Sequence, residues 1–118
     1  MDRNLSLNEV PEIKTVFGQE TSFEGNLEYD TSLKILGKFK GQIKTSGYLE
    51  IGSTAEVEAG IFAGTVIING YVKGNIEATE RLEMHSKGKI YGNVRTNKLK
   101  IADGVVFEGN CYMLEQEN

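Results

Sequence analysis

The chain repeats one short phrase six times, and this repetition limits the folds that it can adopt. In each copy a large apolar residue is followed by any residue, a small residue, usually Asn or Gln, and another apolar residue. The small residue falls at positions 25, 41, 59, 74, 92 and 109, so successive copies lie 16, 18, 15, 18 and 17 residues apart. A nearly fixed period is typical of repeat proteins, in which each unit buries its apolar face only against its neighbours. The copies are Phe23–Leu27, Phe39–Ile43, Val57–Ile61, Val72–Ile76, Ile90–Val94 and Phe107–Cys111.

Alternation inside the phrase predicts short β-strands. Phe39, Gly41 and Ile43 are expected on one side of the strand, and the lysines and glutamine between them on the other, which is the two-residue period of a half-buried strand. A second alternating segment lies between the phrases, and turn residues separate the two kinds of segment. Such a unit predicts one coil of a β-helix, hydrogen-bonded to the coils above and below at roughly 4.8 Å. The second segments are Leu33–Ile35, Leu49–Ile51, Val66–Ile68, Leu82–Met84 and Leu99–Ile101.

The small residue of each phrase has a predicted structural role. Three consecutive inward side chains would crowd a narrow interior at a bend, so we expect Gly, or Ala at position 59, to relieve that crowding and let the backbone turn.

The residue before the small position supports the same alignment of coils. Its first four members alternate in charge, so direct stacking would place unlike charges next to each other on one face. An exposed pair contributes about 0–1 kcal/mol, so this ladder is interpreted as a register device and not as a source of stability. The six members are Glu24, Lys40, Glu58, Lys73, Tyr91 and Glu108.

Bulk composition narrows the function classes. The 118 residues predict one domain, and 13 basic against 17 acidic residues give a net charge of −4, with no basic stripe for nucleic acid. There is one cysteine, no apolar run of signal-peptide or membrane-spanning length, and no phosphate-binding loop of the G-x-x-x-x-G-K-[ST] kind. We therefore expect a soluble cytoplasmic protein that binds neither nucleic acid nor nucleotide.

Residues that could carry chemistry have simpler interpretations. His85 is the single histidine and is expected to be a solvated loop residue, because acid–base catalysis needs positioned partners. Cys111 occupies an inward position and is predicted to be a small buried hydrophobe. Glu56 and Glu58 belong to an outward charged face. We predict no catalytic residue, no metal site and no cofactor, and therefore no enzyme.

The ordered set of phrases closely resembles the bactofilin family over roughly Thr15 to Met113. The resemblance depends on the opening Thr15–Gly18, on Phe23–Leu27, on the rhythm of Gly70–Ile76 and on the closing Phe107–Met113. It implies an all-β, right-handed β-helix of roughly triangular section, here with about six coils. It divides the chain into a flexible tail (1–14), a polymerisation domain (15–113) and a short flexible C-terminal tail (114–118).

The resemblance also implies a function. Bactofilins are bacterial cytoskeletal scaffolds that polymerise end to end without nucleotide, which implies a role in cell shape or envelope organisation. The partner implied first is a further copy of the chain, and cell-wall-modifying enzymes are the clients implied next. Some members contact the inner face of the membrane through their N-terminus, and the candidates for a weak contact of this kind are Met1, Leu5 and Leu7.

The two ends of the predicted solenoid are the candidate functional sites. A terminal coil exposes unpaired backbone groups and an open apolar layer unless a polar cap covers it, and no cap is evident in the sequence. We therefore predict that the polymer contacts lie in the first and last coils. The candidate residues are Phe17, Phe23 and Leu27 at one end and Val105, Val106, Phe107, Cys111, Tyr112 and Met113 at the other.

Two alternatives belong to other function classes. One is a left-handed β-helix acyltransferase, which needs strict six-residue spacing and usually a catalytic histidine at a subunit groove. The other is a capped, monomeric β-solenoid that binds a partner on one flat face. The mass in solution separates the three: a discrete trimer for the enzyme, a monomer for the module, and a broad high-mass species for the scaffold.

Overall fold

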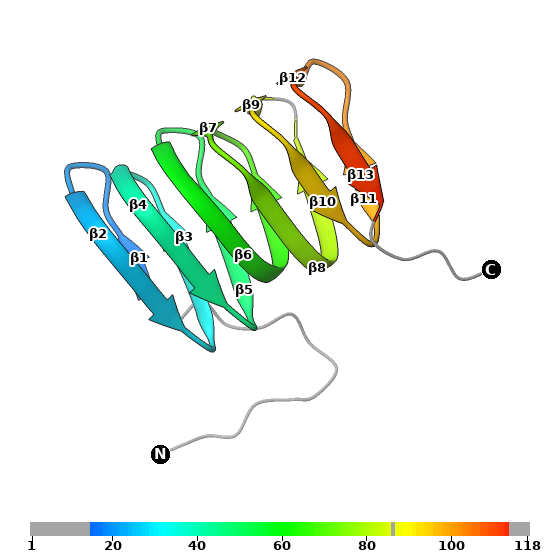
Figure 1. The fold of residues 1–118 in the computed structure, drawn as a ribbon. Helices are drawn as coiled ribbons and strands as arrows, with labels where there is room; N and C mark the ends of the chain where they lie inside the picture. Colours follow the sequence, from blue (N-terminus) through cyan, green and yellow to red (C-terminus); the bar gives the residue numbers. More distant parts are fainter. Residues whose placement is uncertain (1–14, 86, 114–118) are drawn as a thin grey trace, which may run out of the picture.

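A computed structural model describes residues 15–85 and 87–113, and this part of the chain folds into thirteen parallel β-strands. The predicted tails, including Met1, Leu5 and Leu7, lie outside the described residues. Figure 1 shows the strands stacked as successive coils from β1 to β13. The strands are β1 (Thr15–Phe17), β2 (Ser22–Tyr29), β3 (Ser32–Ile35), β4 (Lys38–Thr45), β5 (Tyr48–Ile51), β6 (Glu56–Ile68), β7 (Tyr71–Lys73), β8 (Ile76–Met84), β9 (Lys89–Tyr91), β10 (Val94–Thr96), β11 (Leu99–Ile101), β12 (Val106–Glu108) and β13 (Cys111–Met113).

The strands line three faces of a solenoid. Face A contains the start of β2, β4 and β6, followed by β7, β9 and β12. Face B contains the second half of β2 and β4, the middle of β6, the start of β8, and β10 and β13. Face C contains β1, β3, β5, the ends of β6 and β8, and β11. Each face has six rungs, so the predicted all-β solenoid of about six coils with a three-sided section is confirmed. The right hand of the coil stays a prediction of the resemblance.

The register follows the repeat that the sequence predicts. Phe23 pairs with Phe39, Phe39 with Val57, and Val57 with Val72, so the phrases stack directly on one another. The coils differ in length, and one irregularity in the pairing of β6 with β8, between Ala63 and Thr65, absorbs part of the difference. Unequal spacing along the chain is therefore compatible with one continuous stack.

The core runs along the axis of the solenoid through the four inner coils. Along β4, exposed lysines alternate with the buried Phe39 and Ile43, as the two-residue period predicts. Each fully buried Leu, Ile or Val side chain contributes about 1.5–3 kcal/mol relative to exposure. The largest fully buried side chains are Phe39, Ile35, Ile43, Leu49, Ile51, Ile68, Ile76, Leu82, Met84, Ile90, Val57 and Val66.

The glycine between faces A and B lets the backbone turn, as predicted, but the crowding that it avoids is not the predicted one. Gly41 and Gly92 have φ of 132° and 147°, a backbone conformation that side chains rarely adopt. A Cβ on either glycine would fall on the carbonyl oxygen of the corresponding glycine in the preceding coil. The prediction that Gly relieves crowding in the interior is therefore wrong, because the conflict is with the backbone of the neighbouring coil. Ala59 fits the same corner because its φ is not positive.

Candidate assembly surfaces

The first coil ends in an open aromatic layer. Phe17, Phe23 and Leu27 point inward in register with the core but remain half-buried, because no described coil precedes them. The ring centroids of Phe17 and Phe23 lie 5.7 Å apart, and those of Phe23 and the fully buried Phe39 lie 5.0 Å apart. The Phe23 and Phe39 rings are stacked and Phe17 is tilted against Phe23, so this end of the core is a layer of aromatic rings.

The last coil ends in a more exposed layer. Phe107 and Val105 are half-buried and pack against the core, whereas Met113 is 50% exposed. Cys111 pairs in register with the fully buried Val94 but is itself exposed, so the prediction of a buried cysteine is wrong for the isolated chain. The thiol is partly shielded from water, and this desolvation raises its pKa above the ordinary value. The predicted inward position of Cys111 is confirmed by this register, and the side chain is exposed because no described coil lies above it.

The structure places all nine predicted end residues in the first or last coil, but two of them point outward. Val106 and Tyr112 occupy outward positions of the last coil, in register with Lys89 and Arg95, and border the end layer without forming it. Three inward residues of the terminal coils were missed by the sequence prediction. They are Tyr29, Leu99 and Ile101, and the same two-residue alternation that selected Leu27 could have identified them.

Backbone groups of the terminal coils are also unpaired in the described part of the chain. β1 and β2 pair only with β3 and β4, and β11, β12 and β13 pair only with strands of the preceding coil. Within residues 15–85 and 87–113, β1 and both halves of β2 at one end, and β11, β12 and β13 at the other, therefore have one edge without a strand partner. Open edges of this kind are templates for pairing with another chain.

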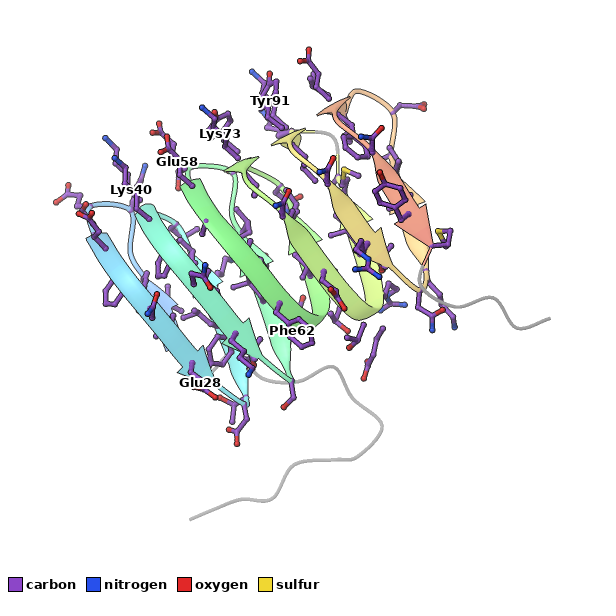
Figure 2. The ribbon with its side chains drawn as sticks, viewed as in Figure 1. Glu28, Lys40, Glu58, Phe62, Lys73 and Tyr91 are labelled. Carbon is purple, nitrogen blue, oxygen red and sulfur yellow. The ribbon has the colours of Figure 1, made fainter. Side chains whose placement is uncertain are left out.

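Face A carries the predicted ladder of charges. Glu24, Lys40, Glu58 and Lys73 occupy successive rungs, and Figure 2 shows the last three in line with Tyr91 along one edge of the molecule. No ion pair within 4.0 Å joins these side chains in the described residues; on face C, Lys34 and Glu50 form one at 3.7 Å. The predicted stacking of unlike charges is therefore present, and its role as a register device stays a prediction.

The residues considered for catalysis or metal binding lie at the surface. The imidazole Nε2 of His85 lies 3.1 Å from Oε1 of Glu83, and Nε of Arg81 lies 3.1 Å from the other carboxylate oxygen. Glu56 and Glu58 occupy outward rungs. Within residues 15–85 and 87–113 there is no group of three His, Cys, Asp or Glu side chains that could hold a metal ion. The same residues include no candidate for a membrane-spanning helix.

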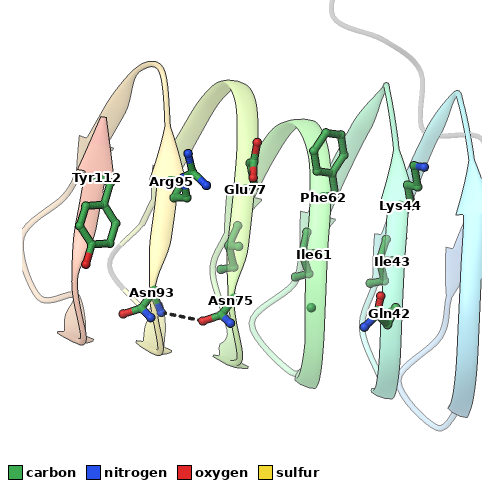
Figure 3. A pocket seen from close by; sticks show the side chains of 12 residues that line it. Gln42, Ile43, Lys44, Ile61, Phe62, Asn75, Glu77, Asn93, Arg95 and Tyr112 are labelled. Atoms are coloured by element: carbon green, nitrogen blue, oxygen red, sulfur yellow. Dashed lines mark hydrogen bonds between the residues drawn. The ribbon is translucent and has the colours of Figure 1, made fainter. Parts of the chain in front are cut away.

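Face B has a shallow hollow that the sequence analysis did not predict. A row of amide side chains crosses this face, and the backbone N–H of Asn93 donates to Oδ1 of Asn75 at 3.3 Å (Figure 3). The row is interrupted at Gly60, where no side chain projects, and the hollow of about 700 Å³ includes this interruption. Lys44, Phe62, Glu77, Arg95 and Tyr112 form a second outward row beside it.

Comparisons with known proteins agree with this geometry. The family model described as bactofilin, polymer-forming cytoskeletal, matches residues 15–112. Two bactofilins of Myxococcus xanthus (strain DK1622) are similar: BacO is 34% identical over 84% of this chain and 79% of its own length, and BacP is 32% identical over 87% of this chain. The chain spans 43% of the length of BacP.

A solved structure shares the fold. It is the cryo-EM reconstruction of Thermus thermophilus bactofilin double helical filaments, with a TM-score of 0.81, 28% identity, and coverage of 85% of this chain and 99% of that chain.

Proposed function

The chain belongs to the bactofilin family of polymer-forming cytoskeletal proteins, and from this premise we propose that it assembles end to end into a static scaffold. The joints form where the open layers of the first and last coils stack on those of neighbouring molecules. The observation that carries this proposal is the exposure of inward residues at both ends. Ile101 is 48% exposed, whereas Met84, one coil earlier in the same register, is fully buried.

Stacking at the ends would continue both kinds of interaction that hold the coils together. The free strand edges of β1, β2 and β11 to β13 would gain partners in parallel or antiparallel pairs. The half-exposed side chains of the layer would become core, at about 1.5–3 kcal/mol for each fully buried large residue. No nucleotide is needed to drive such a contact, and the sequence has no nucleotide-binding loop.

We expect like ends to meet, as the family resemblance implies. Each joint is then isologous, and the filament has no polarity. The scaffold would act in the cytoplasm on cell shape or envelope organisation and recruit clients such as cell-wall-modifying enzymes. Contact with the membrane through Met1, Leu5 and Leu7 stays a prediction. The double helical filaments named for the Thermus thermophilus protein support a filament as the working form.

A charge placed in one end layer tests the proposal. Phe107→Arg puts an unpaired cation into a dry joint, which is costly, and should abolish long polymers in sedimentation and negative-stain microscopy. Glu108→Arg is the matched control, because Glu108 is the next residue and points outward. Circular dichroism should show that both variants remain folded.

The size of the blocked species also gives the polarity. Joints between like ends leave Phe107→Arg as a dimer through its intact first coil, whereas joints between unlike ends leave a monomer. Polymers of Phe107→Arg equal to those of the unmodified protein would remove the last coil from the proposal. A monodisperse unmodified monomer at high concentration would favour the capped binding module instead.

A further inference from the structure

Phe62 is the one large hydrophobic residue that is exposed in the four inner coils of the described chain. Its side chain is 42% exposed on face B, in the middle of β6. The remaining exposed large hydrophobic residues lie in the first or last coil, where an end joint can account for them. They are Val16, Ile101, Val106, Tyr112 and Met113. The joints of the proposed filament therefore give no reason for an exposed aromatic ring at this place.

The side chains around Phe62 form an ordered row on face B. The strand register stacks Glu28 on Lys44, Lys44 on Phe62, Phe62 on Glu77 and Glu77 on Arg95. These five residues, defined here as the Phe62 row, occupy five successive rungs at about 4.8 Å spacing. Figures 2 and 3 show Phe62 projecting from the middle of this face, with Lys44 and Glu77 on the rungs beside it in Figure 3.

The Phe62 row is complementary to its own reverse. We propose that a second copy of this chain packs on face B about a two-fold axis that runs parallel to β6 at Phe62. Phe62 then faces Phe62 of the second copy, Lys44 faces Glu77, and Glu28 faces Arg95. The Phe62 contact lies on the axis and occurs once, and each of the two charge pairs occurs twice, as an isologous interface requires.

This register pairs more unlike charges than any other register of the two rows. A shift of one rung in one direction brings Lys44 opposite Arg95, and a shift in the other direction brings Glu28 opposite Glu77. Two rows that run in the same direction without a shift would place every charge against an identical charge. Like charges brought together across an interface cost several kcal/mol, so the charges of the row favour this direction and this register over those one rung away.

The second row of face B fits the same arrangement. Gln42 would face Asn75, and amide side chains can donate to and accept from one another. Gly60 would face Gly60, and the missing side chains leave the hollow of about 700 Å³ beside the ring, into which the ring of the second copy can lean. Two sheets can pack face to face at roughly 10 Å, which matches a contact made by single side chains.

This contact uses a side face, so it does not depend on the end joints of the proposed function. It would join two molecules side by side with their solenoid axes in opposite directions, whether those molecules belong to two filaments or are single. The expected partner is a second copy because one row supplies both members of each unlike pair. A foreign protein would need its own matching row.

A charge swap combined with cross-linking tests the proposal. Phe62→Cys in a Cys111→Ser background is treated with a short bis-maleimide, and the cross-linked dimer is measured on denaturing gels. Glu58→Cys in the same background is the matched control, because Glu58 is also outward on β6 but lies on face A. We expect the dimer from Phe62→Cys and little from Glu58→Cys.

The charge variants then test the register. Adding Glu77→Lys alone, or Lys44→Glu alone, should lower the yield of dimer about tenfold, since each places like charges opposite one another. The double variant Lys44→Glu with Glu77→Lys restores both unlike pairs and should restore the yield. Unchanged yield in the single variants, or no recovery in the double variant, would overturn the proposal and favour a different partner for face B.

Failure of the end joints can be recognised separately. The Phe107→Arg change removes filaments but leaves face B intact, so the same cross-linked dimer should form in that background. If filaments remain long and single and the Phe62→Cys dimer is absent, the lateral contact is contradicted. The proposal of end joints would be unaffected by that result.

Discussion

The inner and terminal coils carry the same kinds of side chain in the same register, yet their exposure differs. Leu82 and Val94 are fully buried, whereas Leu99 and Cys111, one coil later at the same positions, are half-buried and exposed. The chemistry of the residue does not explain this difference, because both members of each pair are apolar or weakly polar. The difference is that the last coil covers Leu82 and Val94, whereas no described coil covers Leu99 and Cys111. An exposed apolar residue in a terminal coil therefore occupies a core position that no further coil covers.

The two ends also differ from each other. The first coil closes with aromatic rings, with Phe17 tilted against Phe23 at 5.7 Å, while the last coil presents Ile101, Met113 and Cys111. Aromatic rings are rigid, and flexible thioether and aliphatic side chains adapt to whatever covers them. Joints between like ends would thus produce two joints of different chemistry along one filament, and joints between unlike ends would produce a single mixed kind.

The largest effect is expected where a glycine corner has a coil beneath it. Gly92→Ala would drive a Cβ onto the carbonyl oxygen of Gly74, and the neighbouring backbone would have to move, at a cost of about 4 kcal/mol or more in the free energy of unfolding. Gly25→Ala has nearly the same φ, 143° against 147°, but no coil among the described residues precedes it. It should cost only the backbone strain, about 1–3 kcal/mol. Urea unfolding of both variants in the Phe107→Arg background measures the difference.

Two outcomes bear on this comparison. Equal losses of stability in the two variants would mean that backbone strain alone, and not the neighbouring coil, sets the cost. If the first coil forms a joint, Gly25→Ala in the protein without the Phe107→Arg change should also weaken polymerisation, while the monomer remains folded. Unchanged sedimentation of Gly25→Ala polymers would contradict close stacking at that corner.

A smaller effect is expected from truncating one leucine in each kind of coil. Leu82→Ala removes a fully buried side chain and should cost about 2–5 kcal/mol. Leu99→Ala, directly above it in the register, should cost about half as much or less in the unpolymerised chain, because part of its surface already faces water. Denaturation midpoints in the Phe107→Arg background give both values.

Polymerisation should change the difference in stability between Leu99→Ala and Leu82→Ala. In filaments the layer of Leu99 is covered, so the cost of Leu99→Ala should approach that of Leu82→Ala when the same measurement is made on filaments of the unblocked protein. An identical small cost of Leu99→Ala in filaments and in the blocked chain would show that the last coil stays open.

Much of the fold was predictable because a two-residue period and a repeated phrase are properties of the sequence itself. The strand register, with Lys40 between Glu24 and Glu58, follows from aligning the phrases. The same period also places Val106 and Tyr112 outward once Phe107 and Cys111 are inward, so these two residues border the end layer.

Other features depend on contacts between coils that the sequence does not record. The reason for glycine at the corner lies in a positive φ and in the carbonyl of the preceding coil, neither of which follows from composition. The position of Phe62 could be assigned to the outward side, but the hollow beside it arises because Gly60 interrupts a row of amides from other coils. Predicting this hollow from the sequence would therefore require the correct alignment of at least three coils.

The smallest expected effect concerns Cys111, whose thiol reports on the end layer without disturbing it. Partial burial raises its pKa, so at a given pH the folded chain holds less thiolate than the unfolded chain and should react more slowly with iodoacetamide. The corresponding contribution to stability is present below the ordinary thiol pKa and is lost as the pH rises through the raised value. Rates measured from pH 7 to pH 10, with the urea-unfolded chain as control, give the direction of the shift. In filaments the layer containing Cys111 would be covered, and alkylation should fall further than in the Phe107→Arg variant; equal rates in both would mean that no molecule stacks on the last coil.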